Sequence, residues 1–252
     1  MRKIVRIGLL IFRSILIFVA IGAFTTASVK NVMKLVIVEK FKSQGVYQED
    51  ISTDKIKYYR IESDEEKGFK KVGNNILPGA PGDILVSTQA TVVNPLVSGL
   101  ISFFAGGHAA ICCDDYRDYE ISLDSSISIE ATGLESGANL AKPFNKSYWM
   151  NDLVFTEIMA LRVDMNESEK KEVLSNSSAL LGDPYNFSFI FNTENKSYCS
   201  DIVSKAYSKI GANLNKDGFT TSVYDLIVSN DTYLSYYHYY DNNNVLHIYY
   251  LG

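Results

Sequence analysis

Cys199 stands at the start of a helical pattern, a position in which a thiol can serve as a nucleophile. The N-terminus of a helix carries partial positive charge, which favours the thiolate over the thiol. A catalytic thiolate also needs a base or an imidazolium partner. The chain offers only three histidines for this role, His108, His238 and His247, so the search for a Cys-His pair is a short one.

His108 is the histidine best placed to act with Cys199. It follows Gly106-Gly107 and opens a strand-like apolar run, and Glu130 lies on the polar face of the next alternating segment, residues 127–132. If these two strands pair antiparallel, the Glu130 carboxylate reaches the far nitrogen of His108 and stabilises its imidazolium form. The three residues are therefore the candidate catalytic set.

Each of these residue types has a structural alternative. A histidine after glycines is ordinarily structural, an acidic side chain on a strand face is usually solvated, and a lone cysteine is more often a small buried hydrophobe. The start of a helix and the polar residues around Cys199 favour the catalytic interpretation.

The other cysteines and histidines are assigned to packing or to the surface. Cys112 and Cys113 lie among apolar residues, and three cysteines without CxxC spacing argue against a disulfide framework and against a structural zinc site. His238 lies within an aromatic run and His247 near the C-terminus. The sequence contains no glycine-rich phosphate loop and no standard metal motif, so we expect no cofactor and no metal.

Composition sets broader limits. The chain has 252 residues, of which 46% are hydrophobic, enough for one sizeable core or two small ones. Its net charge is −5, and no basic patch interleaved with aromatic residues is present. We therefore expect no nucleic-acid partner.

The N-terminus carries a targeting signal. Arg2, Lys3 and Arg6 precede an apolar stretch that Arg13 interrupts and that resumes to Phe24. Residues 1–30 are either a cleaved signal peptide or a membrane anchor, and the sequence leaves both open. Because positive charge precedes the apolar run, both alternatives put the bulk of the chain outside the cytoplasm, secreted or anchored to the membrane.

The rest of the chain divides into a lead-in and a compact domain. Residues 31–41 continue the helical pattern, and the polar stretch that follows suggests that residues 31–77 are a lead-in or stalk. Turn chemistry at residues 78–82 marks the start of a domain that covers residues 78–252. We expect helices over residues 166–181, 199–210 and 222–229, and strands over residues 83–87, 108–113, 127–132, 155–163 and 247–251. This irregular order predicts an α+β fold.

Five short motifs in succession resemble a known superfamily. They are PGDIL at residues 81–85, GHAAI at 107–111, SIEA at 128–131, GDPYN at 182–186 and YCSDIV at 198–203. Their order is similar to the circularly permuted branch of the NlpC/P60 papain-like superfamily, in particular its YiiX-like members. The resemblance covers about residues 78–240 and departs from the usual pattern at Ala109-Ala110, where members often have valine and glycine.

The resemblance implies a papain-like α+β core, in which a cysteine-bearing helix packs on an antiparallel sheet. The N-terminal hydrophobic helix that precedes this core is predicted from the sequence alone and lies outside the resemblance. It implies that Cys199 is the nucleophile, His108 the base and Glu130 the residue that orients the base. Tyr198, or the backbone N–H of Cys199, would help to bind the oxyanion.

The implied activity is that of a thiol hydrolase acting on amide or ester bonds. The substrates would be cell-wall peptides or lipid and amino-acid amides, with the membrane as a partner through the N-terminal segment. Two alternatives stay open. One is an acyltransferase of the lecithin:retinol acyltransferase-like type, and the other is a non-catalytic surface-binding module on the same fold.

Overall fold

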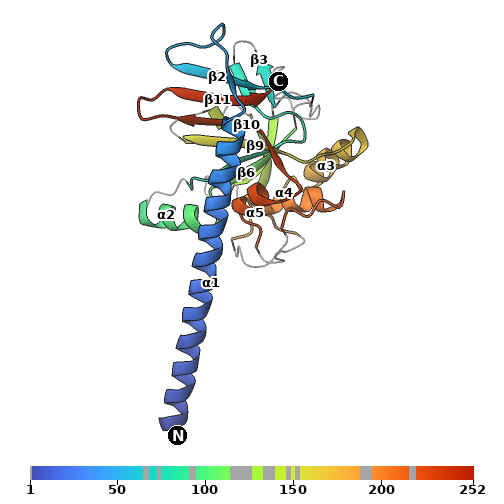
Figure 1. The fold of residues 1–252 in the computed structure, drawn as a ribbon. Coiled ribbons are helices and arrows are strands. Elements are labelled where there is room, and N and C mark those ends of the chain that lie inside the picture. The colour runs from blue at the N-terminus through green and yellow to red at the C-terminus, as the bar shows by residue number, and fades with distance from the viewer. Residues whose placement is uncertain are drawn as a thin grey trace.

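The computed structural model describes residues 2–64, 68–72, 75–90, 95–113, 127–132, 140–145, 149–150, 154–187, 195–215 and 220–252. A long N-terminal helix leads into a domain in which helices pack on a sheet (Figure 1). The helices are α1 (Arg2–Lys42), α2 (Pro95–Phe104), α3 (Glu167–Ala179), α4 (Cys199–Ser208) and α5 (Val223–Val228). The strands are β1 (Val46–Tyr47), β2 (Ile56–Ile61), β3 (Phe69–Val72), β4 (Asn75–Pro78), β5 (Ile84–Ser87), β6 (His108–Cys112), β7 (Ile127–Thr132), β8 (Leu140–Asn145), β9 (Glu157–Arg162), β10 (Tyr233–Tyr240) and β11 (Leu246–Leu251).

Nine of the described strands form one sheet, in the order β1-β2-β11-β10-β9-β5-β6-β7-β8. The β2–β11 pair is parallel and the other pairs in this sheet are antiparallel. β3 and β4 form a separate antiparallel hairpin. The α+β architecture with a preceding apolar helix agrees with the sequence-based prediction.

Both faces of the sheet are buried, and alternate residues of each central strand enter different cores. On one face, Ile84 and Ile111 pack with Ile202 and Val203 of α4. On the other face, Leu85 and Ala110 pack with other apolar and aromatic side chains. Because successive side chains of a strand point to opposite faces, the run from Ile84 to Ser87 is buried throughout, which explains its continuous apolar sequence.

The predicted helices form with the ends that their sequences favour. Asn166 caps α3: its side-chain oxygen accepts hydrogen bonds from the backbone N–H groups of Ser168 and Glu169, at 2.9 and 3.0 Å, and the Glu169 carboxylate accepts from the N–H of Asn166. This reciprocal capping box satisfies amide groups that lack helical partners. The apolar stripe predicted for α4 is buried and includes Ile202, Val203, Ala206 and Tyr207.

The structure differs from the expected lead-in at residues 46–61. Instead of a loose stalk, β1 and β2 form one edge of the sheet, and β2 pairs in parallel with β11, with Tyr58 opposite Ile248. Tyr58 and Ile61 are buried. β2 is held in the sheet by its pairing with β11, a strand almost two hundred residues later in the sequence. A local sequence pattern cannot predict such a distant contact.

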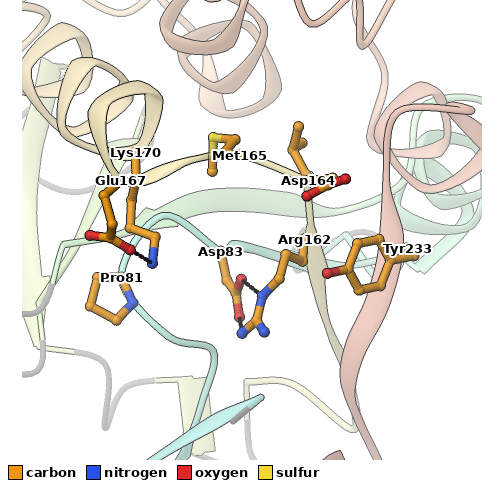
Figure 2. A pocket seen from close by; sticks show the side chains of 9 residues that line it. Pro81, Asp83, Arg162, Asp164, Met165, Glu167, Lys170 and Tyr233 are labelled. Atoms are coloured by element: carbon orange, nitrogen blue, oxygen red, sulfur yellow. Dashed lines mark hydrogen bonds and ion pairs between the residues drawn. The ribbon is translucent and has the colours of Figure 1, made fainter. Parts of the chain in front are cut away.

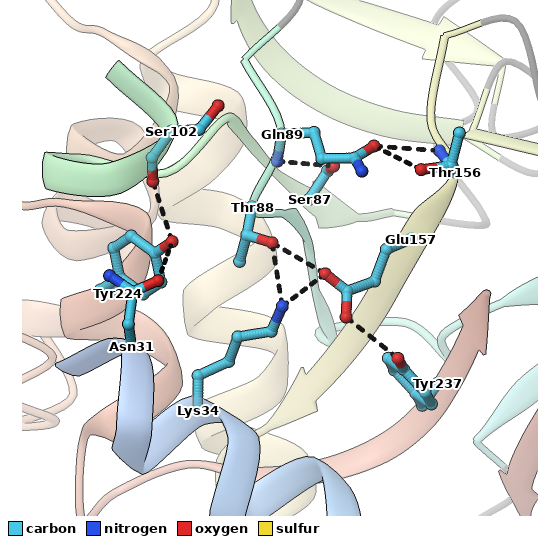
Figure 3. A network of polar contacts seen from close by, with 10 residues as sticks. All are labelled: Asn31, Lys34, Ser87, Thr88, Gln89, Ser102, Thr156, Glu157, Tyr224 and Tyr237. Atoms are coloured by element: carbon cyan, nitrogen blue, oxygen red, sulfur yellow. Dashed lines mark hydrogen bonds and ion pairs between the residues drawn. The ribbon is translucent and has the colours of Figure 1, made fainter. Parts of the chain in front are cut away.

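The C-terminal part of α1 is fixed to the domain by polar contacts (Figure 3). The Lys34 ammonium lies 2.5 Å from Glu157 Oε2 and 3.1 Å from the Thr88 hydroxyl oxygen, and the Tyr237 hydroxyl donates to the same carboxylate. Lys30 pairs with Asp225 of α5 at 2.5 Å. The N-terminal part of α1 projects away from the domain (Figure 1), and its side chains from Arg6 to Thr26 are exposed.

Within the described residues, the segment Arg6–Lys42 is long and apolar enough to cross a membrane. A signal sequence near the N-terminus meets the same criteria, so the two alternatives for the N-terminus both remain.

A buried ion pair joins Asp83, the residue directly before β5, to Arg162 of β9 (Figure 2). The Arg162 guanidinium donates to both carboxylate oxygens of Asp83, at 2.7 and 2.9 Å. The Ala80 N–H and the Ser235 hydroxyl also donate to this carboxylate. Beside the pair lies a cavity of about 200 Å³, and Lys170 and Glu167 form a more exposed ion pair at its rim. The Asp83 charge is thus fully partnered.

Removing the buried cation is expected to destabilise the fold. Arg162→Met leaves the Asp83 carboxylate buried without its counter-ion, which costs about 3–5 kcal/mol of unfolding free energy. Lys170→Met, at the exposed pair beside the same cavity, is the control and costs less than about 1 kcal/mol. Urea unfolding of the detergent-solubilised chain measures both, and equal losses would contradict this account.

Candidate active site

His108 and Glu130 are brought together by the register of two neighbouring strands. β6 and β7 pair antiparallel, with Ile111 opposite Ile129 and Cys112 opposite Ser128. The same register places Glu130 diagonally across from His108 on one face of the sheet. His108 Nε2 lies 2.8 Å from Glu130 Oε2. The contact that the strand pattern predicted is therefore present.

The Glu130 carboxylate is buried and held by two further donors. The Ser128 hydroxyl donates to Oε1 at 2.5 Å, and the indole N–H of Trp149 donates to the same oxygen at 2.6 Å. A buried carboxylate needs such partners, because an unpaired charge in the interior is costly. These hydrogen bonds fix the carboxylate in the orientation in which it meets the imidazole.

Aromatic rings hold the imidazole in position. The ring of His108 stacks on Trp149, with 5.5 Å between the centroids, and lies parallel to Phe155 at 6.4 Å. Trp149 and Phe155 stack on each other at 4.8 Å and are buried. The His108 side chain keeps 19% of its surface exposed. The aromatic contacts thus restrain the orientation of the ring, while part of the side chain stays accessible.

The two glycines before His108 are required by close backbone contacts. Gly107 donates its N–H to the carbonyl of Ser87 at 3.0 Å. A Cβ at Gly107 would lie 2.0 Å from the Gln89 carbonyl oxygen, and one at Gly106 would lie 2.6 Å from a carbon of Val223. Gly106 also has a φ of 83°, which favours glycine. The glycines therefore let β6 start close against its neighbours.

Cys199 is the first residue of α4, and the segment before it is pinned. Ser197 forms a parallel bridge with Tyr185, and its hydroxyl donates to Asp183 at 3.1 Å. At the other side of Cys199, the Ser200 hydroxyl donates to the Thr221 carbonyl at 2.8 Å. The GDPYN and YCSDIV motifs thus lie side by side and hold the start of α4.

The Cys199 thiol and the Glu130 carboxylate both hydrogen-bond to the imidazole of His108. The sulfur also accepts hydrogen bonds from the backbone N–H groups of Ala109 and Ser200. Cys199 is 8% exposed. The structure therefore joins all three members of the predicted set, although they come from two strands and a helix.

This arrangement shifts the pKa of both reacting groups. Burial by itself lowers the pKa of His108, but the hydrogen bonds to Cys199 and Glu130 outweigh it and raise the pKa to about 10. Burial raises the pKa of Cys199, but the hydrogen bond and charge of His108, together with the two backbone N–H groups, lower it on balance. Both shifts favour the thiolate–imidazolium form of the pair.

Two tyrosines lie near the thiol. The Tyr198 hydroxyl oxygen accepts a hydrogen bond from the Thr221 N–H at 2.9 Å, which ties the start of α4 to the segment before α5. Burial, and then the charge of Asp201, raise the pKa of Tyr198. Burial and the charge of Cys199 raise the pKa of Tyr185. Both phenols thus stay protonated at neutral pH.

Three residues that contribute to this site were not predicted from the sequence. Trp149 and Ser128 hold the carboxylate, and Tyr185 lies close enough to feel the charge on the sulfur. Ser128 was detectable, because it lies two residues before Glu130 on the same strand face. Trp149 comes from outside the paired strands, so no periodicity pointed to it.

The other sequence assignments concern packing. Cys112, Cys113 and His238 are buried, and all three cysteines are free thiols. His247 is partly buried and stacks between Tyr59 and Tyr239. Among the residues that the structure describes, no three His, Cys, Asp or Glu side chains gather in a group that could hold a metal ion.

Comparison with protein families settles the relationship. Residues 80–235 match the family described as permuted papain-like amidase enzyme, YaeF/YiiX, C92 family. The chain belongs to this family. The C92 relationship confirms the resemblance to the YiiX-like branch, and it identifies the chain as an amidase- or peptidase-like enzyme.

A solved structure is similar to this C92 member. It is described as metalloprotein yiiX from Escherichia coli O157:H7, and it matches with a TM-score of 0.47 and 16% sequence identity, over 61% of this chain and 94% of that chain. No curated protein matches the sequence.

The lowered thiol pKa can be measured directly. At about pH 6, where an ordinary cysteine is protonated, we expect the folded chain to show thiolate absorbance in the ultraviolet that Cys199→Ala removes. Cys112→Ala, which removes a buried thiol of β6, is the matched control and should leave the signal unchanged. Thiolate absorbance that develops only above about pH 8.5 would contradict the proposed ion pair.

Proposed function

We propose that the chain is a thiol hydrolase in which Cys199 is the nucleophile, His108 the acid–base group and Glu130 the residue that orients and charges the imidazole. The observation that carries this proposal is the position of the His108 ring, which meets both the Cys199 thiol and the buried Glu130 carboxylate. This is the order of groups that nucleophilic catalysis by a thiolate needs.

The reaction follows from the positions of these groups. The Cys199 thiolate attacks the carbonyl carbon of an amide or ester, and the negative charge that develops on the carbonyl oxygen is stabilised by N–H groups at the start of α4. The His108 imidazolium gives its proton to the leaving amine or alcohol as the acyl–enzyme forms. The neutral imidazole then takes a proton from a water molecule as the water oxygen attacks the acyl carbon. The bond between that carbon and the Cys199 sulfur breaks, which releases the acid and restores the thiolate and the imidazolium. Glu130 stabilises the positive charge of the His108 ring whenever that ring is protonated.

Tyr198 has a structural use in addition to any contact with substrate. Its hydroxyl oxygen accepts the Thr221 N–H, which ties the start of α4 to the segment before α5. We propose that the backbone N–H groups of α4 are the main oxyanion donors and that Tyr198 supports them by holding the segment before α5.

The proposed substrates are cell-wall peptides or amides of lipids and amino acids. An apolar helix precedes the domain, and positive charge precedes that helix. This order supports a location outside the cytoplasm, with the chain anchored to the membrane or secreted after cleavage. Both substrate classes occur in that compartment.

Substitution of the three residues tests the mechanism. We expect Cys199→Ala and His108→Ala to lower hydrolysis of a fluorogenic amide by about 10³-fold or more, and Glu130→Gln by about 10²–10⁴-fold. Cys113→Ala, which removes a buried thiol outside the site, should keep wild-type activity. Folding of each variant is checked by circular dichroism, and a folded Cys199→Ala chain with full activity would sink the proposal.

Product analysis separates hydrolysis from acyl transfer. We expect the free acid as the main product when the enzyme cleaves peptide or lipid amides, with or without an added acceptor amine or alcohol. An acyl-acceptor conjugate as the main product would identify an acyltransferase instead. If Cys199→Ala retains ligand binding and full biological activity, the chain is a non-catalytic binding module.

A further inference from the structure

α2 carries a continuous exposed apolar face. Its sequence, PLVSGLISFF, contains no charged residue, and none of its residues is buried. Leu96, Leu100 and Phe104 follow a four-residue spacing along one side and are 74%, 53% and 42% exposed, while Val97 and Ile101 beside them are 41% and 38% exposed. Exposed apolar patches of this kind mark interaction sites with membranes or proteins.

The position of α2 beside α1 indicates a lipid bilayer as the occupant. The Phe24 ring of α1 packs on Phe103 of α2, with 5.2 Å between the centroids, and the Asn31 side-chain N–H donates to the Phe103 carbonyl at 3.1 Å. Figure 1 shows α2 lying across α1 at the end of the domain from which α1 projects. A helix that lies in a membrane surface beside a spanning helix has this arrangement.

The length of α1 outside the domain fits this placement. Residues 7–24 are exposed, and eighteen helical residues at about 1.5 Å each extend for ~27 Å. The hydrocarbon core of a bilayer is ~30 Å thick. Arg13 lies about two helical turns from Arg6. Its long side chain can therefore extend along the helix to the lipid headgroups on the side of the bilayer away from the domain. A span that ends near Phe24 puts α2 at the bilayer surface on the side of the domain.

We propose that α2 is a membrane-interface helix, which inserts its apolar face beside the α1 span and holds the Cys199–His108 site against the bilayer that carries the substrate. Phe104 and His108 are only four positions apart in the sequence, so their Cα atoms lie within ~14 Å of each other. The part of this proposal that concerns substrate rests on the hydrolase function above. This position of the site favours, as substrates, amides or esters at the level of the lipid headgroups over soluble peptides.

Fluorescence quenching by brominated lipids tests the docking of α2 without reference to activity. The full chain is placed in phosphatidylcholine/phosphatidylglycerol vesicles with brominated acyl chains, as wild type, Leu100→Trp or Val46→Trp. Val46, in β1, is the exposed control position, and the native Trp149 is buried. We expect the emission that the Leu100→Trp substitution adds to be blue-shifted and largely quenched by the brominated acyl chains. The emission that the Val46→Trp substitution adds should persist. An unquenched Leu100→Trp signal overturns the proposal, and a blue shift without quenching indicates that a protein surface covers α2.

Activity measurements test the substrate class separately. We expect Leu100→Gln to lower cleavage of a vesicle-borne lipid amide several-fold and to leave cleavage of a soluble amide unchanged, while Val46→Gln changes neither. Equal losses on both substrates overturn the assignment of a lipid-borne substrate. If the wild-type chain cleaves neither substrate, the hydrolase function fails, and the quenching result alone decides the docking of α2.

Discussion

The site depends on the His108 imidazolium, which contacts both the Glu130 carboxylate and the Cys199 thiol. Without this cation, a negative charge on either group would be costly to bury. The Glu130 carboxylate is fully buried and the Cys199 sulfur nearly so. Burial of an isolated charge is costly, but the His108 imidazolium offsets that cost for the Glu130 carboxylate and favours the thiolate form of Cys199. The same contacts raise the pKa of His108 and lower that of Cys199. Structural stability and chemical reactivity therefore have the same origin here.

The fold positions these groups from separate parts of the chain. The antiparallel register of β6 and β7 sets the distance from His108 to Glu130. The bridge between Tyr185 and Ser197 and the bond from Ser200 to Thr221 set the start of α4. Since His108 begins β6, its ring lies at the end of the strand and meets both the carboxylate on one face and the helix that packs on the other. None of these constraints is local in sequence.

The sequence predicted the parts of this arrangement that follow from local pattern. The stripe at Ile202, Val203 and Ala206 predicted the helix behind Cys199, and the alternation around Glu130 predicted its strand. The antiparallel pairing of the His108 and Glu130 strands was a hypothesis from their spacing, and the resemblance to a family supported it. Trp149 was missed because its contact with Glu130 comes from a segment without periodicity. β2 was missed as part of the sheet because its neighbour is the last strand of the chain.

The most direct test of the central claim is the protonation state of His108, measured by NMR of a chain labelled with ¹⁵N at its three histidines. His238 provides an internal reference, because burial lowers its pKa to about 3 and keeps its ring neutral. The account predicts that His108 is an imidazolium at about pH 8 in the wild type, and that loss of the thiolate in Cys199→Ala lowers its pKa. A His108 that titrates near its ordinary value of about 6.5 in both proteins would contradict the account.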